Sequence, residues 1–158
     1  MLRTVAQLLD DWIAEHNRSA LSEGALRLPR CTIRVLGQTA LMEGEVPLTL
    51  AATRDVDVQA DYPHAVEQHF RRLLEARSRE LRPPGHEIWM PTETEYRVLY
   101  DGRWVELSIA DMDAILVSKA LKAPAKNRAL ILEYLARGPS PRFLALAARY
   151  GLDLEALT

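Results

Sequence analysis

The segment from Thr53 to Asp61 reads TRDVDVQAD and carries three aspartates. Asp55 and Asp57 are separated by one valine, and the alternation of valines with polar residues predicts a half-buried strand. Because side chains of a strand alternate between its faces, both carboxylates share one face, with Cα atoms about 6.6 Å apart. Two arrangements relieve the repulsion between them: a cation held between the carboxylates, or full solvation on the outer face of a one-sided sheet.

Other common catalytic patterns are missing from the sequence. The four histidines form no HExxH motif, and a single cysteine, Cys31, cannot build a zinc cluster or an internal disulfide. The chain contains no GxSxG, Walker A or GxGxxG motif. Cys31 begins an apolar stretch, so we expect a small buried side chain and not a nucleophile.

Composition places the chain among ordinary globular proteins. Of its 158 residues, 48% are hydrophobic and 27% are charged, and the net charge of −2 argues against a dominant nucleic-acid footprint. The N-terminal stretch is an amphipathic helix interrupted by acids, unlike a signal peptide, and no apolar run is long enough to cross a bilayer. We therefore expect a cytoplasmic protein without membrane contact.

Hydrophobic periodicity predicts the elements that position the aspartates. Strands are predicted at residues 31 to 37, 54 to 59, 86 to 90, 95 to 100 and 103 to 109, with an Asp-Gly hairpin turn between the last two. Helices are predicted at residues 1 to 16, 63 to 82, 111 to 123, 126 to 138 and 141 to 151, and a short one follows Gly37.

This order of elements indicates an α+β fold with a mixed sheet, because the helices are concentrated at the C-terminal end. The length predicts a single domain. We divide it into an N-terminal helix and loop (residues 1 to 30), a sheet core (31 to 110) and a C-terminal helical layer (111 to 158).

A glycine-led turn and short helix, followed by a strand with Asp-x-Asp, resembles the nucleotidyltransferase superfamily of the DNA polymerase β-like fold. The resemblance is greatest to small bacterial members that act as toxins in abortive-infection toxin–antitoxin pairs. It covers about residues 31 to 135 and includes the later block ILVSKALKAPAKNR. The matching residues are Gly37, Ala40, Leu41, Thr53, Asp55, Asp57, Lys119, Lys122 and Lys126. Two residues depart from the pattern. Relatives often have glycine or serine where this chain has Gln38, and they commonly have arginine where it has Ala51.

The resemblance implies an enzyme that moves a nucleoside monophosphate from an NTP to a hydroxyl of RNA or protein. Asp55 and Asp57 would then be catalytic and hold Mg²⁺ or Mn²⁺. The same comparison implies a phosphate-binding set, in which backbone groups near the glycine turn and two lysines contact the nucleotide. Its members are Gly37, Gln38, Thr39, Lys119 and Lys122.

Active members of the superfamily add a third carboxylate from a neighbouring strand. Glu106, which alternates with apolar residues in WVELSI, is our first candidate, and Glu87 in HEIWMP is the second. Glu93 and Glu95 fall in a predicted turn or strand edge. The alternative for each glutamate is a solvated surface residue.

Three interpretations of the whole chain remain open at the level of sequence. The first is a magnesium-dependent nucleotidyltransferase, as the toxin half of a pair with a cognate antitoxin. The second is a catalytically inactive protein of the same fold that serves as a binding or interaction module. In the third, the resemblance is accidental.

Overall fold

A computed structural model, which describes residues 1–83 and 87–158, shows an α+β fold in which one mixed sheet has five strands. The strand order is β3-β2-β1-β5-β4, and β1 pairs antiparallel with β2 but parallel with β5. The strands are β1 (Cys31–Leu36), β2 (Asp55–Asp61), β3 (Glu80–Leu81), β4 (Tyr96–Asp101) and β5 (Val105–Ala110). The helices are α1 (Leu2–Glu23), α2 (Gly37–Glu43), α3 (His64–Glu75), α4 (Met112–Lys122), α5 (Pro124–Arg137) and α6 (Pro141–Arg149), and a 3-10 turn, η1 (Glu155–Leu157), ends the chain.

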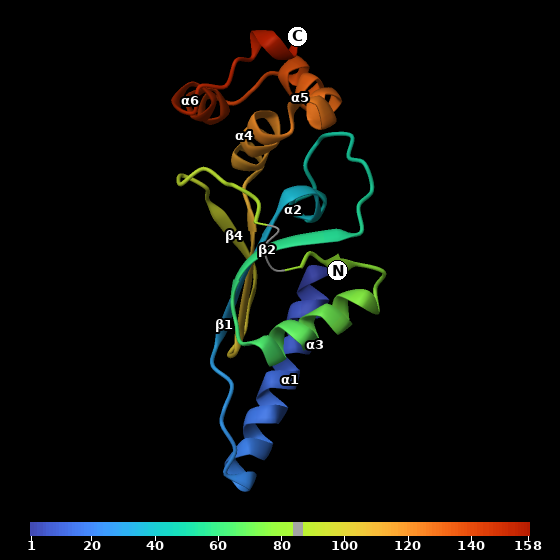
Figure 1. The fold of residues 1–158 in the computed structure, drawn as a ribbon, viewed down its shortest axis with the longest axis vertical. Coiled ribbons are helices and arrows are strands. Elements are labelled where there is room, and N and C mark those ends of the chain that lie inside the picture. The colour runs from blue at the N-terminus through green and yellow to red at the C-terminus, as the bar shows by residue number, and fades with distance from the viewer. Residues whose placement is uncertain (84–86) are drawn as a thin grey trace.

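One face of the sheet is covered by α1 and α3, which lie together on the same side in Figure 1. The apolar stripes of both helices follow a spacing of three and four residues, as an amphipathic helix requires. These stripes and the inward residues of β1, β2 and β5 form one continuous buried core. Its fully buried members include Leu9, Ile13, Ile33, Val35, Val56, Phe70, Leu74 and Leu107. The polar residues of β2 therefore lie on the face that these helices leave uncovered.

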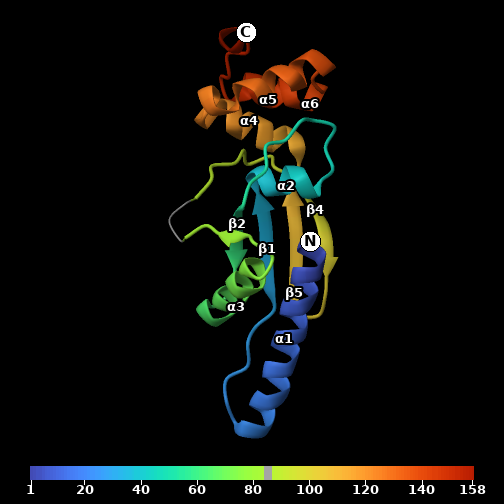
Figure 2. The same ribbon diagram turned by 90° about the vertical axis from the view of Figure 1, so that its right-hand side faces the viewer.

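The C-terminal helices α4, α5 and α6 gather at one end of the sheet, beyond the C-terminal ends of β1 and β5 (Figure 2). They enclose a second apolar cluster around Phe143, and Met112 and Leu130 contact both clusters. Arg142 of α6 is paired with Asp111, the N-cap residue of α4, which fixes α6 to the end of β5. None of the helices in the two described ranges is both long and apolar enough to span a membrane.

The expected α+β architecture is confirmed, and the predicted hairpin (β4 and β5) lies in the same sheet as the aspartate strand. The strand predicted at residues 86 to 90 is wrong for residues 87–90, which are irregular, while residue 86 lies outside the described residues. The backbone carbonyl of Trp89 accepts a hydrogen bond from the Ser118 hydroxyl of α4. This segment therefore packs against the helical layer instead of joining the sheet.

Two helices, α1 and α3, end seven residues away from their predicted ends. α1 continues to Glu23, where Gly24 adopts the left-handed conformation (φ 68°) that commonly ends a helix. α3 stops at Glu75, seven residues before its predicted end, because Ser78 takes a left-handed conformation (φ 58°) and Arg79 N–H donates back to the Leu74 carbonyl. This reversal brings residues 80 and 81 alongside β2 as β3.

Candidate functional site

The two aspartates lie on the same face of β2, as the alternation predicted. Val56 between them is fully buried, while 43% of the Asp55 side chain and 16% of the Asp57 side chain are exposed. The Arg82 guanidinium contacts both carboxylates: its Nη1 lies 3.3 Å from Oδ2 of Asp55, and its Nε lies 3.6 Å from Oδ1 of Asp57. A cation does separate the two charges, and in this structure the cation is a guanidinium.

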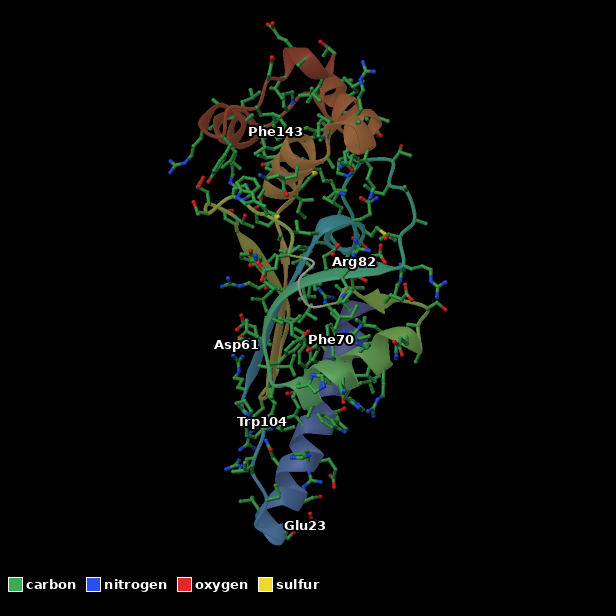
Figure 3. The ribbon with its side chains drawn as sticks, viewed as in Figure 1. Glu23, Asp61, Phe70, Arg82, Trp104 and Phe143 are labelled. Carbon is green, nitrogen blue, oxygen red and sulfur yellow. The ribbon has the colours of Figure 1, made fainter. Side chains whose placement is uncertain are left out.

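The early end of α3 places Arg82 there. β3 runs parallel to β2 with Asp55 beside Glu80 and Val56 beside Leu81, so the residue after Leu81 reaches the level of Asp57. Arg82 N–H donates to the Val56 carbonyl at 3.0 Å, which fixes its backbone to the aspartate strand. Figure 3 shows Arg82 at the opposite end of β2 from Asp61.

Gly37 packs directly against the Asp57 side chain. It joins β1 directly to α2 with a positive φ of 63°, a conformation that residues with a Cβ atom rarely adopt. A Cβ atom at this position would lie 3.1 Å from Asp57 Oδ2 and 3.4 Å from Ile88 Cδ1. Backbone conformation and close packing therefore both require glycine here.

Gln38 and Thr39, predicted to contact phosphate, make structural contacts. The Thr39 hydroxyl, only 3% exposed, donates to the backbone carbonyl of Asp55 at 2.7 Å, so it fixes the start of the aspartate strand. The Gln38 amide donates to the Ala51 carbonyl at 2.8 Å and holds the loop that precedes β2. Gly37 and Gln38 also line a cavity beside the aspartates, so a contact of this turn with phosphate stays a prediction.

A cavity of about 410 Å³ opens above the aspartates, and its volume lies within the range of small-molecule sites. We call it the main cavity. A second cavity of about 310 Å³, the side cavity, adjoins it across Lys119 and Lys126, which line both. The main cavity is lined by Gly37, Gln38, Thr53, Asp55, Asp57, Arg82, Glu87, Ile88, Met90, Ile115, Ser118, Lys119 and Lys126.

The predicted lysines separate into two groups. α4 ends at Lys122 and α5 begins at Pro124, so the three lysines do not form one continuous helical stripe. Lys119 and Lys126 face the aspartates across the main cavity, whereas Lys122 Nζ lies 5.1 Å from the Trp89 ring. Lys126 therefore takes the place beside Lys119 that the sequence assigned to Lys122.

Burial lowers the pKa of Lys119 from its usual value, nearby Lys126 lowers it further, and Asp57 opposes both effects. A half-buried lysine beside another lysine reduces stability as long as both are charged. Such a residue is a candidate for binding an anion, because a phosphate would offset both the cost of burying the charge and the repulsion between the two lysines.

Replacing Lys119 with methionine should raise the free energy of unfolding at pH 7 by about 0.5 to 2 kcal/mol, the range of single stabilising changes. The folded-state pKa of Lys119 lies below its unfolded value, so the penalty is complete below the folded pKa and disappears as pH rises toward 10.5. The gain should therefore shrink in urea titrations at alkaline pH. Lys122→Met, which removes an exposed cation–π contact, is the control and should not stabilise. A Lys119→Met variant less stable than wild type at pH 7 would contradict this account.

Of the two candidates for a third carboxylate, the structure brings Glu87 to the main cavity and leaves Glu106 away from it. Glu106 shares the sheet face of the aspartates, but it lies beside Thr32, whereas Asp57 lies opposite Leu36. These two positions on β1 are four residues apart, or about 13 Å along the strand. Glu106 instead lies 3.6 Å from Arg30.

The glutamates of the predicted turn also belong to other contacts. Glu93 accepts a hydrogen bond from the Tyr150 hydroxyl, and Glu95 lies 3.9 Å from Arg142. Both tie the segment before β4 to α6 and to Tyr150, the residue that follows it. Cys31 is fully buried as expected, and burial together with Asp61 raises its pKa to about 11, so the thiol stays protonated.

The aspartate pair suits a hard cation. Carboxylate oxygens are preferred ligands of Mg²⁺ and Mn²⁺, and the bridging guanidinium shows that the space between the two side chains accepts a positive group. Within residues 1–83 and 87–158, no three acidic, histidine or cysteine side chains come close enough to enclose a metal. The donor set therefore fits an ion held by two carboxylates whose remaining ligands are water and substrate phosphate.

The contact of Arg82 with the aspartates was not predicted, because the sequence places this residue at the end of the helix predicted at 63 to 82. A two-residue strand has no periodicity, so nothing in the local pattern predicts the pairing of β3 with β2. Lys126 was present in the matching block, and the proline after Ala123 was the signal that it belongs to a separate helix.

Comparisons with protein families, with curated proteins and with solved structures yield no significant match to this chain. The case for a function therefore depends on the cavity and the side chains that line it.

Proposed function

We propose that this chain is a nucleotidyltransferase that moves a nucleoside monophosphate from an NTP to a hydroxyl group. The observation that carries the proposal is the main cavity, in which two aspartates of one strand face Lys119 and Lys126 of two separate helices. Acidic groups that bind a cation and basic groups that bind phosphate are the two requirements of a metal–triphosphate site. The resemblance of the glycine turn and the Asp-x-Asp strand to the nucleotidyltransferase superfamily agrees with this chemistry and supports a nucleotidyltransferase-like core.

In the proposed reaction, the acceptor oxygen attacks the α-phosphorus of the NTP. A new oxygen–phosphorus bond forms, the bond to the bridging oxygen breaks, and pyrophosphate leaves with the electron pair. Lys119 and Lys126 hold the triphosphate, and Glu87, which lines the same cavity, accepts the proton of the attacking hydroxyl. Asp55 and Asp57 would hold a divalent ion, which would supply positive charge to neutralise the phosphates.

Several residues act through others in this proposal. Thr39 positions the backbone of Asp55 through its buried hydroxyl, and Gly37 leaves room for the Asp57 carboxylate. Gln38 donates to the Ala51 carbonyl and so holds the segment that leads to Thr53, which lines both cavities. The acceptor in the proposal is an RNA or protein hydroxyl, and a cognate antitoxin is the partner that the resemblance suggests.

An inactive protein of the same fold is the second candidate, and one observation favours it. Arg82 occupies the space between the aspartates and satisfies both charges without a metal. If this pairing were permanent, the cavity would bind an anion through its lysines but would not catalyse transfer. Metal binding separates the two candidates.

The test is calorimetry with Mn²⁺ and each of the four common NTPs. Wild-type protein should bind the metal–nucleotide complex, and an Asp55→Asn, Asp57→Asn double variant should lose at least about 90% of the affinity, because two of the metal's ligands lose their charge. Asp61→Asn is the matched control: Asp61 is exposed and lies opposite Thr32 at the far end of the same strand. Equal binding by wild type and the double variant would refute the metal site.

A further inference from the structure

Arg82 occupies the position that the proposed function assigns to a cation. Its guanidinium reaches Asp55 Oδ2 at 3.3 Å and Asp57 Oδ1 at 3.6 Å, so it contacts one oxygen of each carboxylate that would bind a metal. A divalent ion bound between the same two carboxylates would lie close to the guanidinium, and the two positive groups would repel each other. Metal binding therefore competes with the contacts of Arg82 and favours its displacement.

The surroundings of Arg82 allow its side chain to move away from the two aspartates. Its side chain is 41% exposed, and ion pairs between such exposed groups are weak. Arg82 and Asp55 also line a third cavity of about 260 Å³, whose other charged side chains are Arg71, Glu75 and Glu80. Arg82 thus borders two open spaces, and its backbone is fixed to Val56 by a hydrogen bond that a rotation of the side chain would leave intact.

The main cavity offers the displaced guanidinium a partner once a nucleotide is bound. Arg82 lines this cavity together with Lys119 and Lys126, the proposed phosphate-binding groups. A guanidinium forms paired hydrogen bonds to phosphate oxygens, and these are stronger than neutral hydrogen bonds. The incoming complex therefore supplies both the cation that replaces Arg82 and the anion that receives it.

We propose that Arg82 is a nucleotide-binding residue that exchanges partners, from the aspartate pair in the free protein to the phosphates of a bound NTP. This inference rests on the proposed function, because it takes Asp55 and Asp57 as metal ligands. Its consequence is that the site binds metal alone weakly and binds metal together with nucleotide more tightly. Arg82 thereby couples the two binding events.

The exchange has a thermodynamic signature in an Arg82→Gln variant. Mn²⁺ alone should bind about three- to tenfold more tightly than to wild type, because its competitor is gone. The factor by which NTP raises Mn²⁺ affinity should fall about tenfold, because one charged phosphate contact is lost. Titrations of Mn²⁺, followed by electron paramagnetic resonance with and without NTP, measure both quantities.

Two variants serve as controls for this experiment. Arg72→Gln makes the same change of net charge on the exposed side of α3 and should leave both quantities unchanged. Arg82→Lys keeps the charge but not the paired hydrogen bonds, so its coupling factor should lie between those of wild type and Arg82→Gln. Urea unfolding verifies that each variant is folded.

Three outcomes would overturn the proposal. Equal affinity of wild type and Arg82→Gln for Mn²⁺ alone would show that the arginine does not compete with metal, while the metal site itself stood. Tighter Mn²⁺ binding with an unchanged coupling factor would show that Arg82 withdraws toward Glu75 and Glu80 and not to phosphate. Absence of Mn²⁺ binding by every variant, with or without NTP, would remove the proposed function together with this inference.

Discussion

Replacing Asp57 with asparagine is expected to lower the rate of nucleotide transfer by about 10³-fold or more. A metal ion's stabilisation of transition-state charge is worth several kcal/mol, and each 1.36 kcal/mol corresponds to a factor of ten. Asp57 is the more buried of the two aspartates, and its carboxylate is confined between Gly37 and Arg82. Asparagine has the same shape, so it removes the charge and leaves the packing almost unchanged.

The measurement is transfer of label from α-³²P NTPs to material in a cell extract. Wild-type protein should label a species in the presence of Mg²⁺ or Mn²⁺, and sensitivity of that species to nuclease or to protease identifies the acceptor as RNA or protein. Asp61→Asn should label as wild type does, since Asp61 lies at the far end of β2. Equal labelling by wild type and Asp57→Asn would exclude this aspartate from catalysis.

The same assay examines Glu87, the carboxylate proposed to accept the proton. Glu87→Gln should slow transfer by about 10² to 10⁴-fold, the usual contribution of a general base. It should leave Mn²⁺–NTP affinity unchanged, because the two aspartates hold the metal. Glu106→Gln is the matched control on β5 and should have no effect, since Glu106 pairs with Arg30.

The elements that the sequence predicted well are those with long, regular local patterns. Alternation of apolar and polar residues located β1, β2 and the hairpin, because one face of each strand is covered by helices or other apolar groups. The same alternation correctly placed Asp55 and Asp57 on one face. Local patterns of this kind are therefore enough to predict the sheet strands and the shared face of the two aspartates.

The features that the sequence could not predict depend on contacts between distant segments. β3 exists because its two residues pair with β2, and no pattern within them favours a strand. Residues 87–90 look like a strand, yet they pair with no strand of the sheet, and the Trp89 carbonyl accepts its hydrogen bond from Ser118 of α4. Arg82 lies between these two segments, so its approach to the aspartates could be recognised only in the structure.

Register explains why Glu106 ranked ahead of Glu87 from sequence. The alternation in β5 identifies the face on which Glu106 lies, and this face is the one that carries the aspartates. Alternation does not determine the register between neighbouring strands. Glu106 lies four residues along β1 from the level of Asp57, which places it outside the site. Glu87, which belongs to the irregular segment of residues 87–90, is the candidate that lines the main cavity.

Replacing Gly37 with alanine is expected to have the largest effect on stability among the changes considered, because two costs combine. The left-handed conformation costs about 1 to 2 kcal/mol for a residue with a Cβ atom. Crowding against Asp57 Oδ2 at 3.1 Å, beside Ile88 in a packed site, adds about 1 kcal/mol or more. The sum, about 2 to 3 kcal/mol, would appear as a lower midpoint in urea unfolding followed by circular dichroism.

Gly24 provides a matched control for this prediction. It has nearly the same backbone conformation, with φ of 68°, but a Cβ atom there would meet no atom within 4 Å. Gly24→Ala should therefore show the conformational cost alone and leave Mn²⁺–NTP affinity unchanged. Gly37→Ala should weaken that affinity as well, because the Asp57 carboxylate must shift away from the new methyl group. Equal losses of stability in the two variants, with nucleotide binding intact in both, would mean that Gly37 serves the turn and not the site.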